Sequence, residues 1–252
     1  MKLDFTGRNA LVIGGTTGIG REVVLALAQA GARVVFAGLE PEAGEQLERE
    51  VAAAGGTAHF RPVDVRSDAQ VRTLVEEAAA LLGRIDVAVN NAGIEGVFAP
   101  THLVSEEDFD RIIAVNLKGI WLGLKYQIRH MLAQGGGVIV NTASTASTRA
   151  IPNVPIYSAS KHAVLGLTRA AALEVAAANI RINAVAPGPT HTGLLDRMIE
   201  GKIDIGVIAA SVPMGRVAAP AEAAAAVLWL CSDAASFVTG TALYVDGGVT
   251  AA

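Results

Sequence analysis

The chain has one cysteine, Cys231, among its 252 residues, so it can form no internal disulfide. This composition fits a reducing compartment, and Met1–Arg8 lacks the apolar core of a secretory signal. We therefore expect a cytoplasmic protein. Because Cys231 ends the apolar run Ala226–Cys231, we interpret it as a core residue and not as a nucleophile.

Long apolar runs and metal-binding patterns are also lacking. Although 52% of the residues are apolar, no uninterrupted run approaches the ~18–20 residues that cross a bilayer. No metal-ligand spacing relates the five histidines, at positions 59, 102, 130, 162 and 191. The net charge of −4 is dispersed and leaves no basic stripe for nucleic acid. We expect no membrane span, no metal and no nucleic-acid partner.

The sequence does contain an alternation of short apolar runs and longer helical patterns. The runs expected as strands are residues 9–14, 33–38, 57–63, 86–89, 137–142, 180–186 and 241–246. The helical patterns cover residues 18–30, 41–54, 68–82, 106–133, 156–178 and 220–231. This alternation predicts a single α/β domain over residues 1–252, a Rossmann-like, doubly wound parallel sheet of about seven strands with helices on both faces. Residues 191–213 break the alternation and are expected to form a substrate lid.

A glycine-rich turn, Gly14–Gly20, follows the first expected strand and leads into a helical segment. In this context glycines let the backbone approach a pyrophosphate, which lies at the positive end of the helix. The spacing is Gly-x-x-x-Gly-x-Gly, which differs from the usual Gly-x-Gly-x-x-Gly fingerprint. Asn90, Ser144 and Pro187 also follow expected strands, so all four segments should meet at one edge of the sheet, where such folds bind ligands.

Tyr157 and Lys161 lie four residues apart and therefore on one face of a helix. An unperturbed tyrosine has a pKa near ~10 and is a poor base at neutral pH, but a nearby cation lowers that pKa. Ser144, thirteen residues before Tyr157, offers a hydroxyl to the same substrate oxygen. The set predicts acid/base chemistry on alcohols or carbonyls, although Tyr-x-x-x-Lys pairs are also common on solvated helices and Ser144 could simply cap a strand end.

Together these motifs resemble the short-chain dehydrogenase/reductase family, in its subgroup of about 250 residues. The resemblance covers nearly the whole chain and follows the family's order. It is carried by the glycine turn (with Ile13 in place of the usual threonine), Asp64, Asn90–Gly93, Asn116, Ser144, Tyr157, Lys161, Pro187–Thr192 and Tyr244–Gly248.

The resemblance implies an oxidoreductase that transfers a hydride between a nicotinamide cofactor and a secondary alcohol or ketone. It implies Tyr157 as general acid/base, Ser144 as hydrogen-bond donor to the substrate, and Lys161 as the cation that lowers the phenol pKa and holds the nicotinamide ribose. Asn116 would kink its helix and hold a water. The cofactor residues implied are Gly14, Thr16, Thr17, Gly18, Ile19, Gly20, Gly38, Leu39, Asp64, Val65, Asn91, Ala92, Gly93, Tyr157, Lys161, Pro187, Gly188, Thr190 and Thr192.

The expected substrate walls mix apolar and neutral polar side chains with a single acid. They are Ser144, Thr145, Tyr157, Ile94, Glu95, Ile151, Asn153, Pro189 and residues 193–212 of the lid. The lack of a cationic cluster disfavours phosphorylated substrates, so a neutral secondary alcohol, sugar or cyclic ketone fits. Two alternatives stay open. One is an NADPH-dependent 3-oxoacyl thioester ketoreductase, with Lys125 and Arg129 as modest docking candidates, and the other is a catalytically silent nucleotide-binding protein on the same fold.

The residues Gly38-Leu39-Glu40 bear on the choice between NAD and NADP. In the family, NAD-preferring members usually have aspartate where Gly38 stands. NADP-preferring members usually have arginine where Leu39 stands or a basic residue where Thr17 stands. A 2′-phosphate brings about −1.5 to −2 charge and requires cations, whereas Glu40 would repel it and only Arg61 could reach it. We predict NAD over NADP.

The helical segments 106–133 and 156–178 are apolar around much of their circumference. A helix that is apolar all round is usually buried, and one face of each must already cover the sheet. Similar helices in the family pair into four-helix interfaces, so we expect a homotetramer. The alternative is that these faces, rich in alanine, are tolerably exposed.

Overall fold

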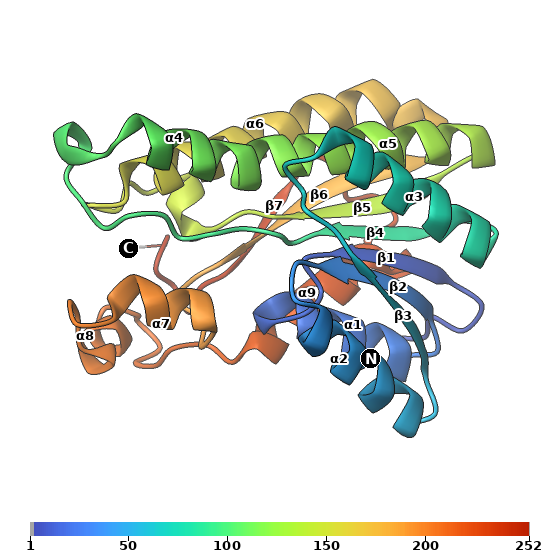
Figure 1. Ribbon diagram of the computed structural model, residues 1–252, viewed down its shortest axis with the longest axis horizontal. Helices are drawn as coiled ribbons and strands as arrows, with labels where there is room; N and C mark the ends of the chain where they lie inside the picture. The colour runs from blue at the N-terminus through green and yellow to red at the C-terminus, as the bar shows by residue number, and fades with distance from the viewer. Residues whose placement is uncertain (1–2, 252) are drawn as a thin grey trace.

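Parallel strands form one sheet in the order β3-β2-β1-β4-β5-β6-β7 in the computed structural model, which describes residues 3–251 (Figure 1). The strands are β1 (Asn9–Ile13), β2 (Arg33–Gly38), β3 (Thr57–Pro62), β4 (Val87–Asn90), β5 (Gly137–Thr142), β6 (Ile180–Pro187) and β7 (Ala242–Val245). The strand order reverses between β1 and β4. Ligands of such folds bind beyond the carboxyl ends of the strands at this switch point.

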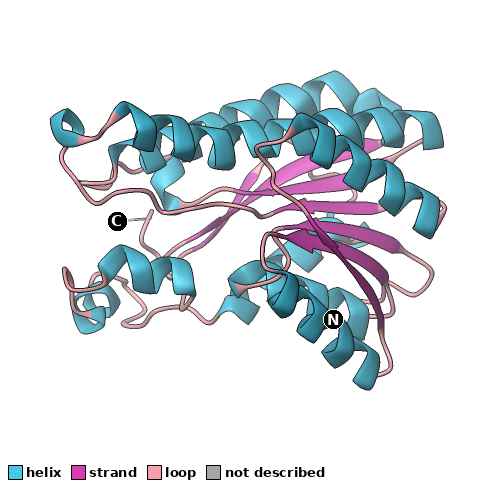
Figure 2. Cartoon of the chain, viewed as in Figure 1, coloured by secondary structure: helices cyan, strands magenta, loops and turns pink. Residues whose placement is uncertain are grey.

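Helices cover both faces of the sheet (Figure 2). One layer contains α3 (Asp68–Leu82), α5 (Gly119–Gln134) and α6 (Pro155–Val175), and the other contains α1 (Gly18–Gln29), α2 (Pro41–Ala53) and α9 (Pro220–Cys231). Each layer buries its apolar stripe against one face of the sheet in a separate core. The predicted doubly wound fold is confirmed. Cys231 lies in the second core, where burial raises the pKa of its thiol to about 12.

The expected helix 106–133 is interrupted in the structure. It divides into α4 (Glu106–Ile113), a π-helical turn (Ala114–Lys118) and α5. Such turns accommodate one extra residue within a helix and are frequent at functional sites. Asn116 lies in this turn, so the helix is distorted at the residue where a kink was expected.

Segment 191–213 contains two short helices, α7 (Gly193–Ile199) and α8 (Ile205–Ala210). They lie beyond the sheet, away from both main layers (Figure 1). Leu195 and Ile199 pack with Val217 in a small apolar cluster of their own. The remaining short elements are 3₁₀ turns at Thr101–Leu103, Thr145–Ser147, Ala176–Ala178 and Asp233–Ala235.

A buried row of amides ties the central strands to the helices above them. Asn90 of β4 donates to Gln127 of α5 and to Asn141 of β5, at 2.9 Å each, and Gln127 donates back at 2.8 Å. Asn141 in turn donates to Thr168 of α6 at 3.0 Å. Gly123 permits this contact, because a side chain there would overlap the amide of Asn90. The row holds α5 and α6 in register over the strands that carry the site.

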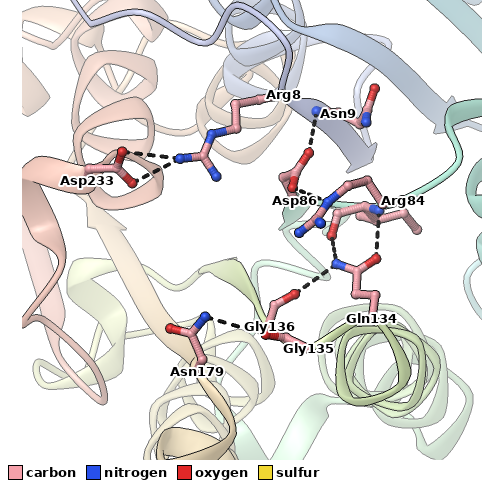
Figure 3. Close-up of polar contacts among 10 residues, drawn as sticks. Arg8, Asn9, Arg84, Asp86, Gln134, Gly135, Gly136, Asn179 and Asp233 are labelled. Atoms are coloured by element: carbon pink, nitrogen blue, oxygen red, sulfur yellow. Dashed lines mark hydrogen bonds and ion pairs between the residues drawn. The ribbon is translucent and has the colours of Figure 1, made fainter.

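The amino edge of the sheet is closed by polar contacts (Figure 3). The buried carboxylate of Asp86 accepts from the backbone N–H of Asn9 at 2.9 Å and from Arg84 at 2.6 Å. Gln134 bonds both the N–H and the carbonyl of Ile85. These contacts satisfy buried backbone groups, and they lie opposite the edge where the glycine turn opens. Within residues 3–251, no helix has the length and apolar character to cross a membrane.

Candidate active site

A cavity of about 620 Å³ lies at the carboxyl edge of the sheet. Ligand sites typically measure ~300–1,000 Å³. The expected segments meet in it. Its lining includes the predicted residues Gly14, Thr16, Thr17, Gly18, Ile19, Gly38, Leu39, Val65, Asn91, Ala92, Gly93, Ile94, Ser144, Thr145, Ile151, Tyr157, Lys161, Pro187, Gly188, Pro189, Thr190 and Thr192.

The glycine turn forms a cradle whose shape depends on missing side chains. Gly14 has φ +80° and Gly18 has φ +54°, both in the left-handed region that favours glycine. A Cβ at Gly14 would overlap the backbone of Ala92, and one at Gly18 would press on the side chain of Thr192. Thr17 precedes α1 at the N-cap position, and its side chain makes no capping hydrogen bond. The positive end of α1 therefore faces the cradle, and these residues fit a dinucleotide pyrophosphate.

Two predicted cofactor residues do not line the cavity. Gly20 faces the turn, and a Cβ there would overlap the carbonyl oxygen of Gly14, so its role in this structure is to permit close packing of α1 on the turn. The carboxylate of Asp64 is bound by Arg66 through Nε at 2.9 Å and Nη2 at 2.7 Å. This contact lowers the pKa of Asp64 and leaves its carboxylate outside the cavity lining.

Two predicted substrate residues also fail to line the cavity. Glu95 is turned toward Arg197, whose guanidinium binds both of its carboxylate oxygens. Asn153 has φ +64°, and its backbone carbonyl accepts from the N–H of Ala99 at 2.8 Å. It shapes the loop through its backbone, because asparagine tolerates the left-handed conformation better than most residues.

A chain of hydrogen bonds joins the glycine turn to the lysine. The carbonyl of Gly14 accepts from Asn91 at 2.9 Å, and Asn91 accepts from the Thr142 hydroxyl at 3.0 Å. The Thr142 carbonyl then accepts from Lys161 Nζ at 2.8 Å. Burial lowers the pKa of Lys161 to about 8, because the charged form loses its hydration. Thr142, which lines the cavity, was not predicted; its position two residues before Ser144 is the one sequence signal for it.

Tyr157 is buried at the end of the cavity beside Ser144. The Ser144 hydroxyl accepts from the backbone N–H of Ala146 at 3.1 Å, so it does cap backbone as the alternative interpretation held. Its own hydrogen can be donated to the Tyr157 oxygen, and this hydrogen bond lowers the phenol pKa.

The expected lowering of the Tyr157 pKa by Lys161 is not found in this structure. Burial is the largest cause and raises the pKa of the phenol, Ser144 acts in the opposite direction, and Glu95 raises it further. Lys161 Nζ lies 5.8 Å from the centroid of the Tyr157 ring and is directed to the Thr142 carbonyl. Desolvation therefore sets the direction of the shift, and Lys161 is not among its causes.

Asn116 is fully buried and supports the site from behind the cavity lining. Its side chain accepts from the N–H of Ile94 at 2.8 Å and donates to the carbonyl of Ile94 at 2.9 Å. It also donates to Ser160 at 3.3 Å, and Ser160 donates to the carbonyl of Tyr157 at 2.7 Å. Asn116 thus positions both the loop after β4 and the helix of the tyrosine.

The cavity includes residues that the motifs did not identify individually. Glu40 lines the cavity beside Gly38 and Leu39, at the end where the adenosine of a dinucleotide would lie (the adenosine end). Thr16 donates to its carboxylate at 2.8 Å. The opposite end is largely apolar and takes much of its wall from the 193–212 stretch, as expected. Its further members are Phe98, Val115, Val154, Leu194, Leu195, Arg197, Met198, Ile199, Ile203 and Ile208.

His191 is exposed and does not line the cavity. The part of the chain that the structure describes contains no cluster of metal-binding side chains.

The family model described as enoyl-(acyl carrier protein) reductase matches residues 14–250. A 2,5-dichloro-2,5-cyclohexadiene-1,4-diol dehydrogenase of Sphingobium indicum is 42% identical over 250 residues, covering 98% of this chain and 99% of the relative. A cyclohexanol dehydrogenase of an Acinetobacter species is 40% identical over 250 residues, covering 99% and 98% of the two chains. The chain belongs to the short-chain dehydrogenase/reductase family.

Solved structures of the family superpose closely on the chain. Levodione reductase has a TM-score of 0.95 at 37% identity, covering 98% of this chain and 99% of that one. NAD⁺-bound xylitol dehydrogenase has a TM-score of 0.92 at 35% identity, with coverage of 97% and 99%. A Burkholderia cenocepacia gluconate 5-dehydrogenase in complex with NADP and tartrate also has 0.92 at 35%, with coverage of 100% and 98%. This chain is an NAD(P)-dependent oxidoreductase that interconverts secondary alcohols and ketones.

Replacing Lys161 should change how stability depends on pH. Below about pH 8 the folded protein must hold a buried ammonium at Lys161, which lowers its free energy of unfolding. Between about pH 8 and the ordinary pKa of 10.5 the folded protein loses this proton while the unfolded chain keeps it, so the cost of burying the charge disappears. The free energy of unfolding of the parent should therefore rise by about 3 kcal/mol relative to Lys161→Met over that range, at ~1.36 kcal/mol per pKa unit. Urea unfolding at a series of pH values measures the difference. A constant difference would contradict the buried cation.

Proposed function

We propose that this chain is an NAD-dependent dehydrogenase of neutral cyclic secondary alcohols, able to reduce the corresponding ketones. The observation that carries the proposal is the meeting of Tyr157, Ser144 and Lys161 at the apolar end of a cavity that begins at a dinucleotide cradle. The names of the relatives support the substrate class, since one acts on cyclohexanol and another on a cyclohexadienediol.

The nicotinamide, when bound, supplies or accepts the hydride and brings a positive charge in its oxidised form. In alcohol oxidation Tyr157 as phenolate takes the hydroxyl proton, and in reduction the phenol returns it. Ser144 would donate to the substrate oxygen, because its hydroxyl oxygen accepts from Ala146 and its hydrogen, which is donated toward Tyr157 in this structure, can turn to a substrate oxygen between the two side chains. Lys161, whose ammonium is directed to the Thr142 carbonyl in this structure, would hold the nicotinamide ribose, and Asn116 keeps both supporting elements in place. We also propose that Asn116 holds a water molecule, as the family resemblance implies.

The apolar end of the cavity supports a neutral alicyclic substrate. Phe98 and Met198 pack with Val154 and Tyr157 in one cluster, and Ile203 and Ile208 face the same space from segment 191–213. Burying a ring against such walls contributes about 25 cal/mol per Å² of apolar surface. We propose that segment 191–213 acts as a lid over this end, supported by the participation of both its helices in the wall.

The two alternatives have less support. A ketoreductase acting on a carrier-bound thioester needs accessible cations for an acidic carrier. Lys125 is paired with Asp68 at 2.9 Å and lies over the Trp121 and Tyr126 rings, so of the two candidates Arg129 alone stays exposed for that role. A catalytically silent protein would not need the complete set of Ser144, Tyr157 and Lys161 in one cavity.

The preference for NAD is supported by the adenosine end. A side chain at Gly38 would overlap Thr16, so the usual aspartate cannot occupy that position without displacing Thr16. The Thr16 hydroxyl instead fixes Glu40, which places a carboxylate beside the cavity for the ribose hydroxyls and against a 2′-phosphate. Arg61 pairs with Glu77 at 3.3 Å and does not line the cavity.

The homotetramer is supported by exposed apolar side chains on the outer helices. Phe109 of α4, Trp121 and Leu132 of α5, and Leu173 of α6 expose 44%, 44%, 50% and 84% of their surface. The helices α4, α5 and α6 lie in one layer (Figure 1), so a second copy packed on this layer could cover the four side chains. We also propose a cytoplasmic location, on the ground that the single cysteine is buried and forms no internal disulfide.

Replacing Tyr157 by phenylalanine should abolish turnover while leaving the fold and cofactor binding intact. Loss of the general base should lower kcat by at least ~10²–10⁴. Absorbance of the reduced nicotinamide, recorded over a panel of cyclic, linear and sugar alcohols and their ketones with both cofactors, measures this. We expect cyclohexanol and substituted cyclohexanols among the best substrates. A phenylalanine variant with parental turnover would refute Tyr157 as the base, and a parent that binds cofactor but turns over nothing would revive the silent protein.

Introducing a cation at the adenosine end should shift the cofactor preference toward NADP. In Leu39→Arg the guanidinium gains a charge-assisted hydrogen bond with the 2′-phosphate, worth about 1.5–3 kcal/mol, which corresponds to roughly ten- to a hundredfold in relative kcat/KM. Leu39→Gln is the matched neutral control and should keep the preference of the parent. A preference for NADP in the unmodified protein would mean that another cation forms the phosphate site.

The oligomer prediction concerns the exposed face of α4, α5 and α6. Light scattering at micromolar concentration should give about four times the 25.8 kDa mass of one chain, because apolar interfaces of this kind are normally obligate. Leu173→Glu should lower that mass by placing a charge in the interface. A single species with the mass of one chain would exclude the assembly.

A further inference from the structure

The wall of the cavity has few charged side chains. Of the described residues that line it, only Glu40, Lys161 and Arg197 are charged. Glu40 stands at the adenosine end, where Thr16 binds its carboxylate, and Lys161 is directed to the Thr142 carbonyl. Among these lining residues, Arg197 is therefore the one cation that lies outside the catalytic set.

The pyrophosphate of a nicotinamide dinucleotide brings a full negative charge on each phosphate. The glycine turn offers it backbone N–H groups and the positive end of α1, which is equivalent to roughly +0.5 of an elementary charge. The cradle by itself thus leaves most of the negative charge unbalanced. A guanidinium is well suited to balance it, because its planar N–H groups match the spacing of phosphate oxygens.

The first turn of α7 brings Arg197 to the glycine turn. Thr192, at the N-cap of α7, lies against Gly18, since a Cβ at Gly18 would be 3.1 Å from Thr192 Cγ2. Helical side chains tilt toward the N-terminus and reach over the residue four positions earlier. Arg197 does so, because its Nη1 lies 3.3 Å from the position that a Cβ of Gly193 would occupy. Gly193 lines the cavity, so the guanidinium lies beside the helix turn that abuts the cradle.

Glu95 orients this guanidinium from the loop after β4. It accepts from Nε of Arg197 at 2.8 Å and from Nη2 at 3.2 Å. The loop is itself fixed, since Asn116 bonds both backbone groups of Ile94. Nη1 makes no hydrogen bond within residues 3–251. Because a guanidinium can bind an anion at each of two edges, Arg197 can keep Glu95 and still donate through Nη1 to a second anion in the cavity.

We propose that Arg197 binds the pyrophosphate of the nicotinamide cofactor and that Glu95 orients its guanidinium for this contact. The pyrophosphate receives backbone N–H groups from the glycine turn and the Nη1 edge of Arg197 from α7. NAD and NADP share the pyrophosphate, so the inference holds for either cofactor. It also goes beyond the proposed function, since it does not depend on which alcohol is oxidised.

Two other anions are less compatible with the position of Arg197. A 2′-phosphate at the adenosine end lies beside the carboxylate of Glu40, which repels it. A carboxylate on the substrate lies at the apolar end, whereas Nη1 is turned back toward Gly193 and the cradle. Both remain as outcomes that the experiment distinguishes.

Equilibrium binding of ADP-ribose tests the inference without turnover. ADP-ribose has the pyrophosphate but lacks the nicotinamide, and adenosine lacks both phosphates. In Arg197→Met the Kd for ADP-ribose, measured by calorimetry, should rise about ten- to a hundredfold, because a charge-assisted hydrogen bond is lost. The Kd for adenosine, measured by ligand-observed NMR because its binding is weaker, should equal that of the parent.

Two variants and one measurement serve as controls. Arg216→Met removes a guanidinium that forms a comparable two-point pair with Glu222 and does not line the cavity, so it should bind ADP-ribose as the parent does. Arg197→Lys keeps the charge and should restore part of the affinity. Thermal unfolding without ligand should give Arg197→Met a Tm close to that of the parent, because the Arg197 side chain is 58% exposed and exposed ion pairs contribute little to stability.

The outcomes separate this inference from its alternatives and from the proposed function. An unchanged Kd for ADP-ribose in Arg197→Met would refute it. It would also be refuted by a loss seen only with NADPH, which would assign Arg197 to the 2′-phosphate, or by an equal loss for adenosine, which would indicate a structural effect. If the parent turns over no cyclic alcohol but Arg197→Met shows the expected loss of ADP-ribose affinity, the substrate class is wrong and the pyrophosphate contact stands.

Discussion

The side chain of Asn116 makes the contact on which the catalytic site depends. Its amide bonds both backbone groups of Ile94 and reaches Ser160 beside the tyrosine. Because the side chain is fully buried, removing it would leave both backbone groups of the partly buried Ile94 without their hydrogen-bond partner. One amide thus holds the loop after β4, the π-helical turn and the tyrosine helix together.

The sheet and its order of elements could be predicted because burial leaves a direct trace in the sequence. A strand covered on both faces is a short apolar run, and each of the expected runs became a strand with its ends shifted by at most two residues. The π-helical turn at Ala114–Lys118 leaves no such trace. Both flanking segments are helical. The extra residue alters the phase of the helix, but the residue types along the segment stay typical of a continuous helix.

The residues of the site could be predicted where a motif fixes the backbone conformation. They were predicted less well where a side chain can bond to several alternative partners. Gly14 and Gly18 line the cavity because their positive φ angles make the cradle. Glu95 was expected to face the substrate, but Arg197, a hundred and two residues further along the chain, binds its carboxylate. The contact between Thr16 and Glu40 likewise depends on how two strand ends meet. Such pairings are tertiary, and spacing along the chain does not encode them.

Burial in this cavity acts against both charged groups of the site. Desolvation opposes the phenolate of Tyr157 and the ammonium of Lys161 alike. The pKa of Tyr157 is therefore raised, that of Lys161 falls to about 8, and Lys161 Nζ is directed to the Thr142 carbonyl and not to the phenol. Because alcohol oxidation requires the phenolate, the site needs a further positive charge near Tyr157 before that residue can act as a base at neutral pH. The oxidised nicotinamide, when bound, would bring such a charge into a space where water screens it poorly, so cofactor binding would favour the protonation state that the reaction needs.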